Sequence, residues 1–319
     1  MLPPRQRYPP AQALRIVFVI PPAIPVTLST GSLYTLGTAR AFEHAARAGY
    51  DGVELLIDDR WDTRQPEYLK RLTDQHAVPI LSVHSPFVTI SGWPRDEVQR
   101  IERTVALAEA VGARTVNVHV PYRFSDLTIS GLGKPILFPF LPPPQDHRRY
   151  ARWLLDGGLD ALQARTPVTI AVENLPSRRF LGVRFSRYAL NSWEEIALIP
   201  SLCLDTTHCG TWDADPTEIF ERLGNRVKHV HLSDWSGRYQ HQPVGTGLIA
   251  LDRFLRHLKE RNYTGIVVVE LTPLSLPVKD ENKLARELRR NLEFCRQHLG
   301  QNTDSVQAST EVKRQVVGV

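Results

Sequence analysis

The sequence predicts an α/β fold, a single (β/α)₈ TIM barrel with a disordered C-terminal tail. Barrels of this type typically occupy about 250 residues, so the chain is long enough for one barrel with tails. Short β-branched runs alternate with longer helical patterns through eight strand-then-helix units. The runs are nearly continuous in apolar residues, as expected for parallel strands that are buried on both faces. The first run is not followed by a Gly-rich turn, which argues against an open dinucleotide-binding sheet.

The expected elements follow one another in regular order. The strands are expected at 15–20, 52–56, 78–83, 115–120, 168–172, 202–204, 227–232 and 265–271. The helices are expected at 38–48, 67–76, 95–111, 146–164, 192–199, 216–223, 251–261 and 283–298. Gly49 and Gly112 stand where a C-terminal helix cap belongs.

These elements form one domain. Residues 1–13 are expected to be an N-terminal extension, 14–300 the barrel, and 301–319 a polar, disordered tail. The barrel is interrupted at 121–145 by a segment rich in Pro, Gly and Phe that shows no period and is expected to be a long loop. Its aromatic residues could cover the mouth of the barrel as a lid, or form a contact in a homo-oligomer.

Composition narrows the class of protein. Of the 319 residues 42% are hydrophobic, close to a typical globular domain, and no apolar run is long enough to predict a membrane span. The three cysteines, Cys203, Cys209 and Cys295, are odd in number and lack metal-binding spacing, which favours a cytoplasmic location. The formal net charge of +5 is a weak signal for an anionic partner, and ordinary solubilising charge explains it better.

Polar residues that could bind a metal recur at the strand ends. They are Glu54, His84, His119, Glu173, Asp205, His231 and Glu270. In a TIM barrel the C-terminal ends of the strands converge on one mouth. Such residues are costly inside a barrel unless they are paired or liganded. Imidazole and carboxylate together suit a divalent ion such as Mn, Zn, Mg or Co, so the sequence predicts a metal site.

Several motifs carry a resemblance that covers about residues 14–299. They are Gly49-Tyr50-Asp51-Gly52-Val53-Glu54-Leu55, Val172-Glu173-Asn174, Cys203-Leu204-Asp205-Thr206-Thr207-His208, His229-Val230-His231-Leu232-Ser233-Asp234, Val244-Gly245-Thr246-Gly247 and Val269-Glu270-Leu271-Thr272-Pro273. With these the chain resembles the xylose isomerase-like TIM-barrel superfamily. That superfamily includes sugar isomerases and epimerases and the endonuclease IV group.

Resemblance to the isomerase and epimerase branch implies a metal held by Glu173, Asp205, His231 and Glu270, with Glu173 and Glu270 also acting as the acid–base pair. The chemistry agrees, because isomerisation or epimerisation removes and returns a proton next to a carbonyl. A metal polarises that carbonyl, and a carboxylate on each face can shuttle protons. The remaining candidates are expected to contact substrate: Glu54, His84, His119, His208, His241, Arg178 and Arg179.

Resemblance to the endonuclease IV branch implies a three-zinc cluster. Its ligand positions match His84, His119, Glu173, Asp205, His208, His231, His241 and Glu270. Tyr239 stands where that branch carries a further Asp ligand, and Asn174-Leu175-Pro176-Ser177 departs from its pattern. By contrast, 241–247 resembles the His-x-Pro-x-Gly-x-Gly turn of isomerase-like members. The isomerase interpretation is therefore favoured over an abasic-DNA phosphodiesterase.

Other interpretations stay open at this point. A dehydratase or other lyase could use the same metal and the same proton abstraction, and a non-catalytic metabolite-binding protein could retain a vestigial site. Arg178, Arg179, Arg184 and Arg187 follow the fifth expected strand and could bind an anionic small-molecule substrate, or form a solvated loop with salt bridges. Without a clear basic surface interleaved with aromatic residues, a nucleic-acid partner is not expected.

Overall fold

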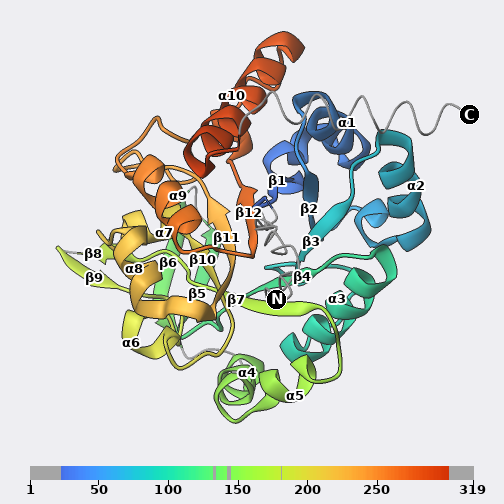
Figure 1. Ribbon diagram of the computed structural model, residues 1–319. Coiled ribbons are helices and arrows are strands. Elements are labelled where there is room, and N and C mark those ends of the chain that lie inside the picture. Colours follow the sequence, from blue (N-terminus) through green and yellow to red (C-terminus); the bar gives the residue numbers. More distant parts are fainter. Residues whose placement is uncertain (1–22, 132–133, 142–144, 181, 302–319) are drawn as a thin grey trace, which may run out of the picture.

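The computed structural model describes residues 23–131, 134–141, 145–180 and 182–301. Within them eight parallel strands close into a barrel with helices on the outside, as predicted (Figure 1). The order around the barrel is β1-β12-β11-β10-β7-β4-β3-β2. The barrel strands are β1 Val26–Ser29, β2 Gly52–Leu56, β3 Ile80–His84, β4 Thr115–His119, β7 Thr169–Glu173, β10 Leu202–Asp205, β11 Val227–Leu232 and β12 Ile266–Val269.

The strand register sets the level at which the polar strand ends meet. β4 pairs with β7 so that His119 is opposite Glu173, and β10 pairs with β11 so that Asp205 is opposite His231. The strands are short and rich in β-branched residues, and nearly every position in them is buried. Neighbouring strand ends therefore present their polar side chains at the same mouth of the barrel.

Helices cover the outside of the barrel. They are α1 Thr38–Ala48, α2 Pro66–His76, α3 Glu97–Val111, α4 Gln145–Leu155, α5 Gly158–Gln163, α6 Trp193–Ile196, α7 Thr206–Thr211, α8 Pro216–Leu223, α9 Leu251–Glu260 and α10 Glu281–Leu299, with 3₁₀ turns η1 Thr30–Leu36, η2 Trp61–Arg64, η3 Gly224–Arg226 and η4 Pro273–Ser275. Gly49 and Gly112 end α1 and α3 in the left-handed conformation, as predicted. In the described part of the chain, no helix combines the length and the apolar character that a membrane span requires.

The first barrel strand is Val26–Ser29, so its assignment to 15–20 was wrong. Residues 15–20 and the expected tail at 302–319 lie outside the described part of the chain. The true strand is only four residues long and alternates apolar with hydroxyl side chains, which made it less conspicuous than the apolar run before it. Pairing with β2 and β12 and complete burial identify Val26–Ser29 as the strand that closes the barrel.

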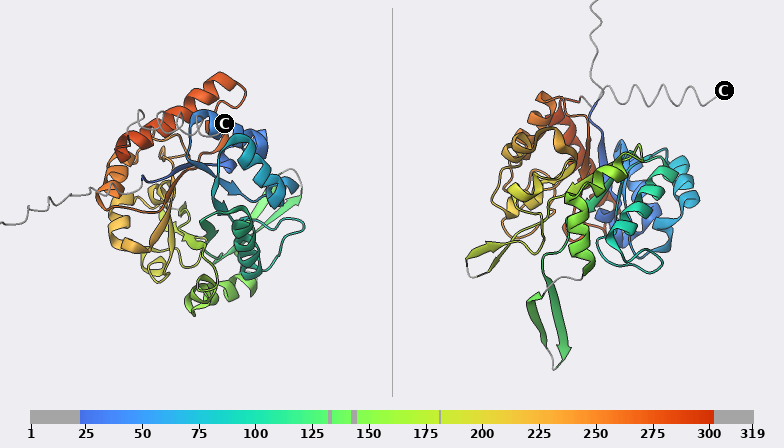
Figure 2. Two further views of the ribbon diagram at one scale, coloured as in Figure 1. Left: turned by 45° about the vertical axis from the view of Figure 1, so that its right-hand side comes forward. Right: turned by 90° about the horizontal axis from the view of Figure 1, so that it is seen from below.

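Two hairpins interrupt the regular alternation of strands and helices. The segment expected to be a long loop contains β5 Ser125–Gly131 and β6 Lys134–Leu141, which pair antiparallel. A smaller hairpin, β8 Arg178–Phe180 with β9 Val183–Phe185, follows β7. Both project from the barrel in the right-hand view of Figure 2. Glycine and proline within 121–145 obscured the strand pattern in the sequence.

The helix expected at 146–164 is divided into α4 and α5. Gly157 adopts a left-handed conformation between them, with φ of 84°. That conformation suits glycine and interrupts the run of helical backbone angles. The segment therefore packs as two short helices, which bury Tyr150 and Leu159 against the barrel.

Candidate functional site

Four side chains expected to bind a metal converge at the mouth of the barrel. Glu173 and Asp205 end β7 and β10, His231 lies on β11, and Glu270 directly follows β12. One potential ligand atom from each lies within 4.8 Å of those of the other three. His231 Nδ1 is 2.9 Å from Glu270 Oε2, 3.5 Å from Glu173 Oε1 and 4.0 Å from Asp205 Oδ2. The fold thus gathers four residues that are far apart in sequence.

The donor set fits a divalent cation. Asp205 Oδ2 and His231 Nδ1 are buried and have no hydrogen-bond partner among the described residues, although burying an unpaired polar atom is costly. Ions with metal–ligand bonds of about 2.0–2.2 Å place their ligand atoms roughly 3–4 Å apart, close to the spacing observed. Three carboxylates and one imidazole suit Mn²⁺, Zn²⁺, Co²⁺ or Mg²⁺.

Burial and the neighbouring imidazoles shift the pKa values of the site carboxylates in opposite directions. Burial would raise the pKa of Glu173, but His231, with hydrogen bonds from His119 and His208, holds that pKa well below its usual value. Burial likewise opposes ionisation of Glu270, yet His231 lowers the pKa of that carboxyl to about 2. The site therefore combines ionised carboxylates with positive charge, and a bound cation would supply charge of the same sign.

Asp205 differs from the other two carboxylates. Its side chain is fully buried, and burial raises its pKa, with Glu173 and Glu270 adding to the effect. The same carboxylate caps α7, because its Oδ1 accepts the backbone N–H of His208 at 2.7 Å. One oxygen therefore fixes the helix start, while Oδ2 is left facing the other candidate ligands.

His84 and His119 flank Glu173 from β3 and β4. Their Nε2 atoms lie 3.5 Å and 3.4 Å from Glu173 Oε2, and the two rings pack edge to face with centroids 5.0 Å apart. His84 Nδ1 donates to the carbonyl of Ser85 at 2.6 Å, which leaves Nε2 to face the carboxylate. With Glu173 these histidines form a second group able to hold a metal.

His208 and His241 form a further such group with Asp205. His208 Nδ1 donates to the carbonyl of Asn174 at 2.8 Å, so its Nε2 is the nitrogen left for other partners. The rings of His208 and His241 pack edge to face at 5.2 Å. His241 has a φ of 51°, a backbone conformation that non-glycine residues adopt rarely and often at functional sites. Its backbone N–H donates to Thr207 Oγ1, which helps hold that conformation.

Glu54, which is expected to contact substrate, lies next to His231 in the barrel interior. Its side chain has no exposed surface and lies beneath His231, with contacts to His229 and His231. Burial would raise the pKa of Glu54, but the charge of His231 and the hydrogen bond from His229 hold that pKa well below its usual value. The described contacts of Glu54 are with these two imidazoles, and its expected contact with substrate stays a prediction.

Sequence reasoning missed two polar residues of the barrel interior, Asn117 and His229. Asn117 Nδ2 donates to Glu173 Oε2, and His229 Nε2 lies 2.8 Å from Glu54 Oε2. Each stands two residues before an expected site histidine, and side chains two apart on a strand share a face. That spacing could have identified both residues.

The arginines after β7 are placed on the small hairpin. Arg179 and Arg184 both pair with Asp213, which favours the salt-bridge interpretation for these two residues. Arg178 is exposed on β8. Tyr239, at the position of a missing carboxylate, is 57% exposed. These residues do not join the converging set described above.

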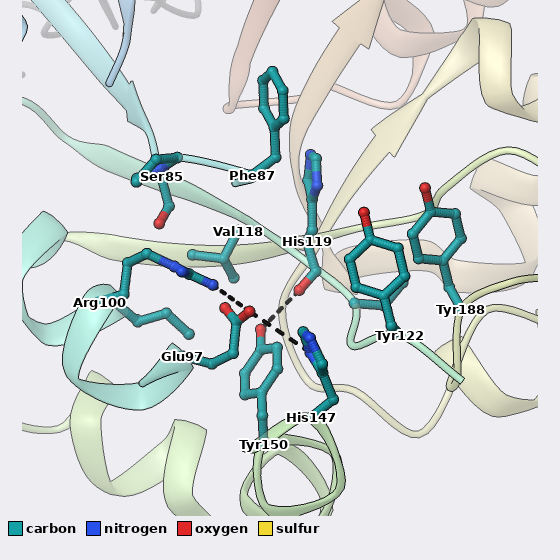
Figure 3. Close-up of a pocket in the computed structure, with 13 residues that line it drawn as sticks. Ser85, Phe87, Glu97, Arg100, Val118, His119, Tyr122, His147, Tyr150 and Tyr188 are labelled. Atoms are coloured by element: carbon teal, nitrogen blue, oxygen red, sulfur yellow. Dashed lines mark hydrogen bonds and ion pairs between the residues drawn. The ribbon is translucent and has the colours of Figure 1, made fainter. Parts of the chain in front are cut away.

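A pocket beside His119 extends the site toward the two hairpins (Figure 3). Phe87, Tyr122 and Tyr188 line it, and Phe87 stacks on His119 with ring centroids 5.8 Å apart. Tyr150 donates to the carbonyl of His119 at 2.8 Å from below, as Figure 3 shows. The aromatic lining therefore lies next to His119, one of the candidate metal ligands.

Comparisons with known proteins agree with this architecture. A family model described as a xylose isomerase-like TIM barrel matches residues 42–298. The uncharacterized protein Rv0498 of Mycobacterium tuberculosis is 32% identical over 301 residues, covering 87% of this chain and 99% of its own length. The probable endonuclease 4 of Phocaeicola vulgatus is 30% identical over 142 residues, 39% of this chain and 51% of that protein.

Solved structures share the fold. A D-tagatose 3-epimerase-like protein superposes with a TM-score of 0.60 at 21% identity, covering 89% of this chain and all of the other. The 3-keto-D-glucoside 4-epimerase of E. coli gives 0.60 at 20% identity, with 86% and 99% covered. An AP endonuclease of family 2 from Brucella melitensis gives 0.57 at 18% identity, with 83% and 96% covered.

Proposed function

This chain belongs to the family of xylose isomerase-like TIM barrels, and we propose that it is a metal-dependent isomerase or epimerase of a sugar, a sugar phosphate or a related polyol or keto acid. The observation that carries the proposal is the convergence of Glu173, Asp205, His231 and Glu270 at one point. The sugar epimerases among the solved structures of the same fold support the substrate class.

The two glutamates are proposed to move protons. They lie on strands that flank β10 and β11 in the barrel, so they approach a bound substrate from two sides. A divalent cation bound by the four residues would polarise the substrate carbonyl and stabilise negative charge on its oxygen. One of the two glutamates, as an ionised carboxylate, can accept a proton from the carbon next to that carbonyl. The other, when it carries a proton, can return that proton to the same carbon from the opposite side, which inverts the carbon.

The histidines around the glutamates are proposed to orient the substrate. His84 and His119 lie beside Glu173, and His208 and His241 lie beside Asp205, so sugar hydroxyls would meet imidazoles on both sides. The aromatic side chains beside His119 would border the part of the substrate that does not react. Arg178 remains a proposed contact for an anionic group.

Solvent exchange tests the proposal. The metal-loaded protein is incubated in D₂O with a panel of ketoses, aldoses, keto-glucosides and sugar phosphates, and deuterium is located by NMR. Incorporation at a carbon next to the carbonyl is expected for a substrate. A complete lack of exchange across the panel, with metal demonstrably bound, would sink the proposal. An unsaturated product in the same spectra would identify a lyase instead.

A zinc phosphodiesterase acting on abasic DNA is the second candidate. The observation that favours it is the pair of additional histidine groups, His84–His119–Glu173 and Asp205–His208–His241, beside the first set. Tyr239, in place of a carboxylate, weakens the case for a three-metal cluster. Three zinc ions per chain, with duplex binding that falls steeply with salt, would favour this candidate. One ion per chain would favour the isomerase.

A non-catalytic role remains the third interpretation. It predicts that replacing both proton-transfer carboxylates leaves the cellular phenotype of the gene unchanged. The two conservative changes Glu173→Gln and Glu270→Gln, combined in one chain, test this directly. A phenotype equal to that of a gene deletion would favour an enzyme.

A further inference from the structure

A buried carboxylate beneath His231 joins two histidines of one strand. Glu54 belongs to β2, and its side chain reaches across the barrel interior to β11. Its Oε2 lies 2.8 Å from His229 Nε2, and its Oε1 lies 3.0 Å from His231 Nε2. None of the three side chains has exposed surface. The contact to His231 is close, but these two atoms do not meet the geometry of a hydrogen bond.

The two nitrogens of His231 face different partners. Nδ1 faces Glu270 Oε2 at 2.9 Å and Glu173 Oε1 at 3.5 Å, whereas Nε2 faces Glu54. An imidazole that binds a cation through Nδ1 keeps a lone pair on that nitrogen and its proton on Nε2. The proton then points at the carboxylate of Glu54, which can accept it. Two imidazole N–H groups thus meet one buried carboxylate.

We propose that Glu54 and His229 are positioning residues, which set the ring orientation and the protonated nitrogen of His231 for cation binding. This inference rests on the metal centre of the proposed function. His229 stands two residues before His231, so both rings project from the same side of β11 toward Glu54. By holding Oε2, His229 leaves Oε1 directed at His231.

A carboxylate behind a metal-binding histidine has a measurable effect. It fixes the tautomer and raises the basicity of the ring, and its loss typically weakens metal binding by 10–100-fold. A carboxylate kept only for packing would have a different signature, because an isosteric amide would preserve the shape and leave metal affinity unchanged. The metal affinity of a correctly folded amide variant therefore distinguishes a positioning role from a packing role.

The experiment compares cation affinity in full-length variants stripped of metal. Zn²⁺ and Mn²⁺ are titrated in competition with a chromophoric chelator, and circular dichroism confirms the fold. Glu54→Gln is expected to bind roughly 10–100-fold more weakly than the wild type. His229→Gln is expected to show a smaller loss of affinity, and Glu54→Asp, which keeps the charge, a partial rescue. Glu102→Gln removes an ion-paired carboxylate of α3 outside this group and should bind normally.

Each outcome decides the inference. Wild-type affinity in folded Glu54→Gln and His229→Gln overturns the positioning role and leaves the metal centre standing. A wild-type chain that binds neither cation overturns both the positioning role and the proposed metal centre. If Glu54→Gln does not fold, the cation affinities of the wild type, Glu54→Asp and His229→Gln still test the positioning role. Equal affinities among these three proteins would contradict the proposal.

Discussion

Asp205 and His208 are joined so that one carboxylate serves both a helix and the candidate metal centre. Oδ1 of Asp205 accepts the backbone N–H of His208 at 2.7 Å, and Oδ2 faces His231 Nδ1 at 4.0 Å. The strand end and the start of α7 are therefore fixed relative to each other by a single side chain. His208, three residues on, is held at the same mouth.

Two substitutions at Asp205 should separate these roles. Asp205→Asn keeps an oxygen that can cap α7 but removes the charge, so metal affinity should fall at least tenfold with a small change in stability. Asp205→Ala also removes the cap, which should lower the free energy of unfolding by about a further 1 kcal/mol. Calorimetric metal titration and urea denaturation measure the two effects. Unchanged metal affinity in Asp205→Asn would remove Asp205 from the ligand set.

The proposed proton-transfer pair gives a prediction for turnover. Glu173→Gln and Glu270→Gln should each lower kcat by roughly 10²–10⁴-fold, because an amide cannot accept the proton of the reacting carbon. Steady-state kinetics on the substrate found by deuterium exchange measures the loss. The exposed change Glu194→Gln is the matched control, since its partner Arg222 lies on an outer helix. Near-normal kcat in either active-site variant would exclude that residue as a proton carrier.

The charge on His208 predicts how the metal-free protein responds to pH. Burial lowers its pKa, but Asp205 and Glu173 outweigh burial and raise it to about 9. Because the pKa of His208 is higher in the folded than in the unfolded chain, protonation of this residue stabilises the fold. This stabilisation is complete below the unfolded-state pKa of about 6.5 and is lost as pH rises through about 9. Metal-free protein should therefore lose up to roughly 3 kcal/mol of stability over that range.

Urea denaturation at a series of pH values tests this loss. His208→Gln should flatten the curve between pH values of about 6.5 and 9, since the titrating group is gone. Metal-loaded protein should also show a flatter curve, because a cation disfavours the protonated imidazole nearby. A wild-type stability that rises over this range would contradict the assigned sign.

Gly210 in α7 gives a packing prediction. A Cβ at this position would lie 2.7 Å from Cβ of Trp235, too close for either to accommodate. Gly210→Ala gains about 1 kcal/mol in helix propensity but should lose about 1–3 kcal/mol to overpacking. The variant should be less stable than the wild type overall, because Cβ of Trp235 cannot move away without its backbone. Thermal denaturation measures the balance, and a variant more stable than the wild type would contradict it.

The sequence predicted the barrel and the converging residues for a specific reason. Parallel strands of a TIM barrel all point their C-terminal ends to one mouth, so Glu173, Asp205 and His231 could be brought together from their positions on strands alone. The side-chain partners could not be predicted in this way. The pairing of Arg179 with Asp213 depends on where the small hairpin folds, and no spacing in the chain encodes it.

The first strand and the long insertion were missed for local reasons. Val26–Ser29 is short and carries hydroxyls at alternate positions, so its burial comes from pairing with β2 and β12. The hairpin of β5 and β6 contains glycine and proline, which reduce the strand signal. The contacts of Glu54 with His229 and His231 could not be predicted, because they depend on how strands that are not neighbours face one another inside the barrel.

Backbone hydrogen bonds join the bases of the two hairpins, β5–β6 and β8–β9. Tyr122 and Tyr188 form an isolated β-bridge, Arg123 N–H donates to the carbonyl of Arg187 at 2.7 Å, and Ala189 N–H donates to that of Pro121 at 2.8 Å. Each hairpin thus supports the aromatic wall of the pocket through the other. For protein engineering, the two insertions act as one unit. A graft of this region would transplant both together, because either one alone would lose the backbone bonds that join the two bases.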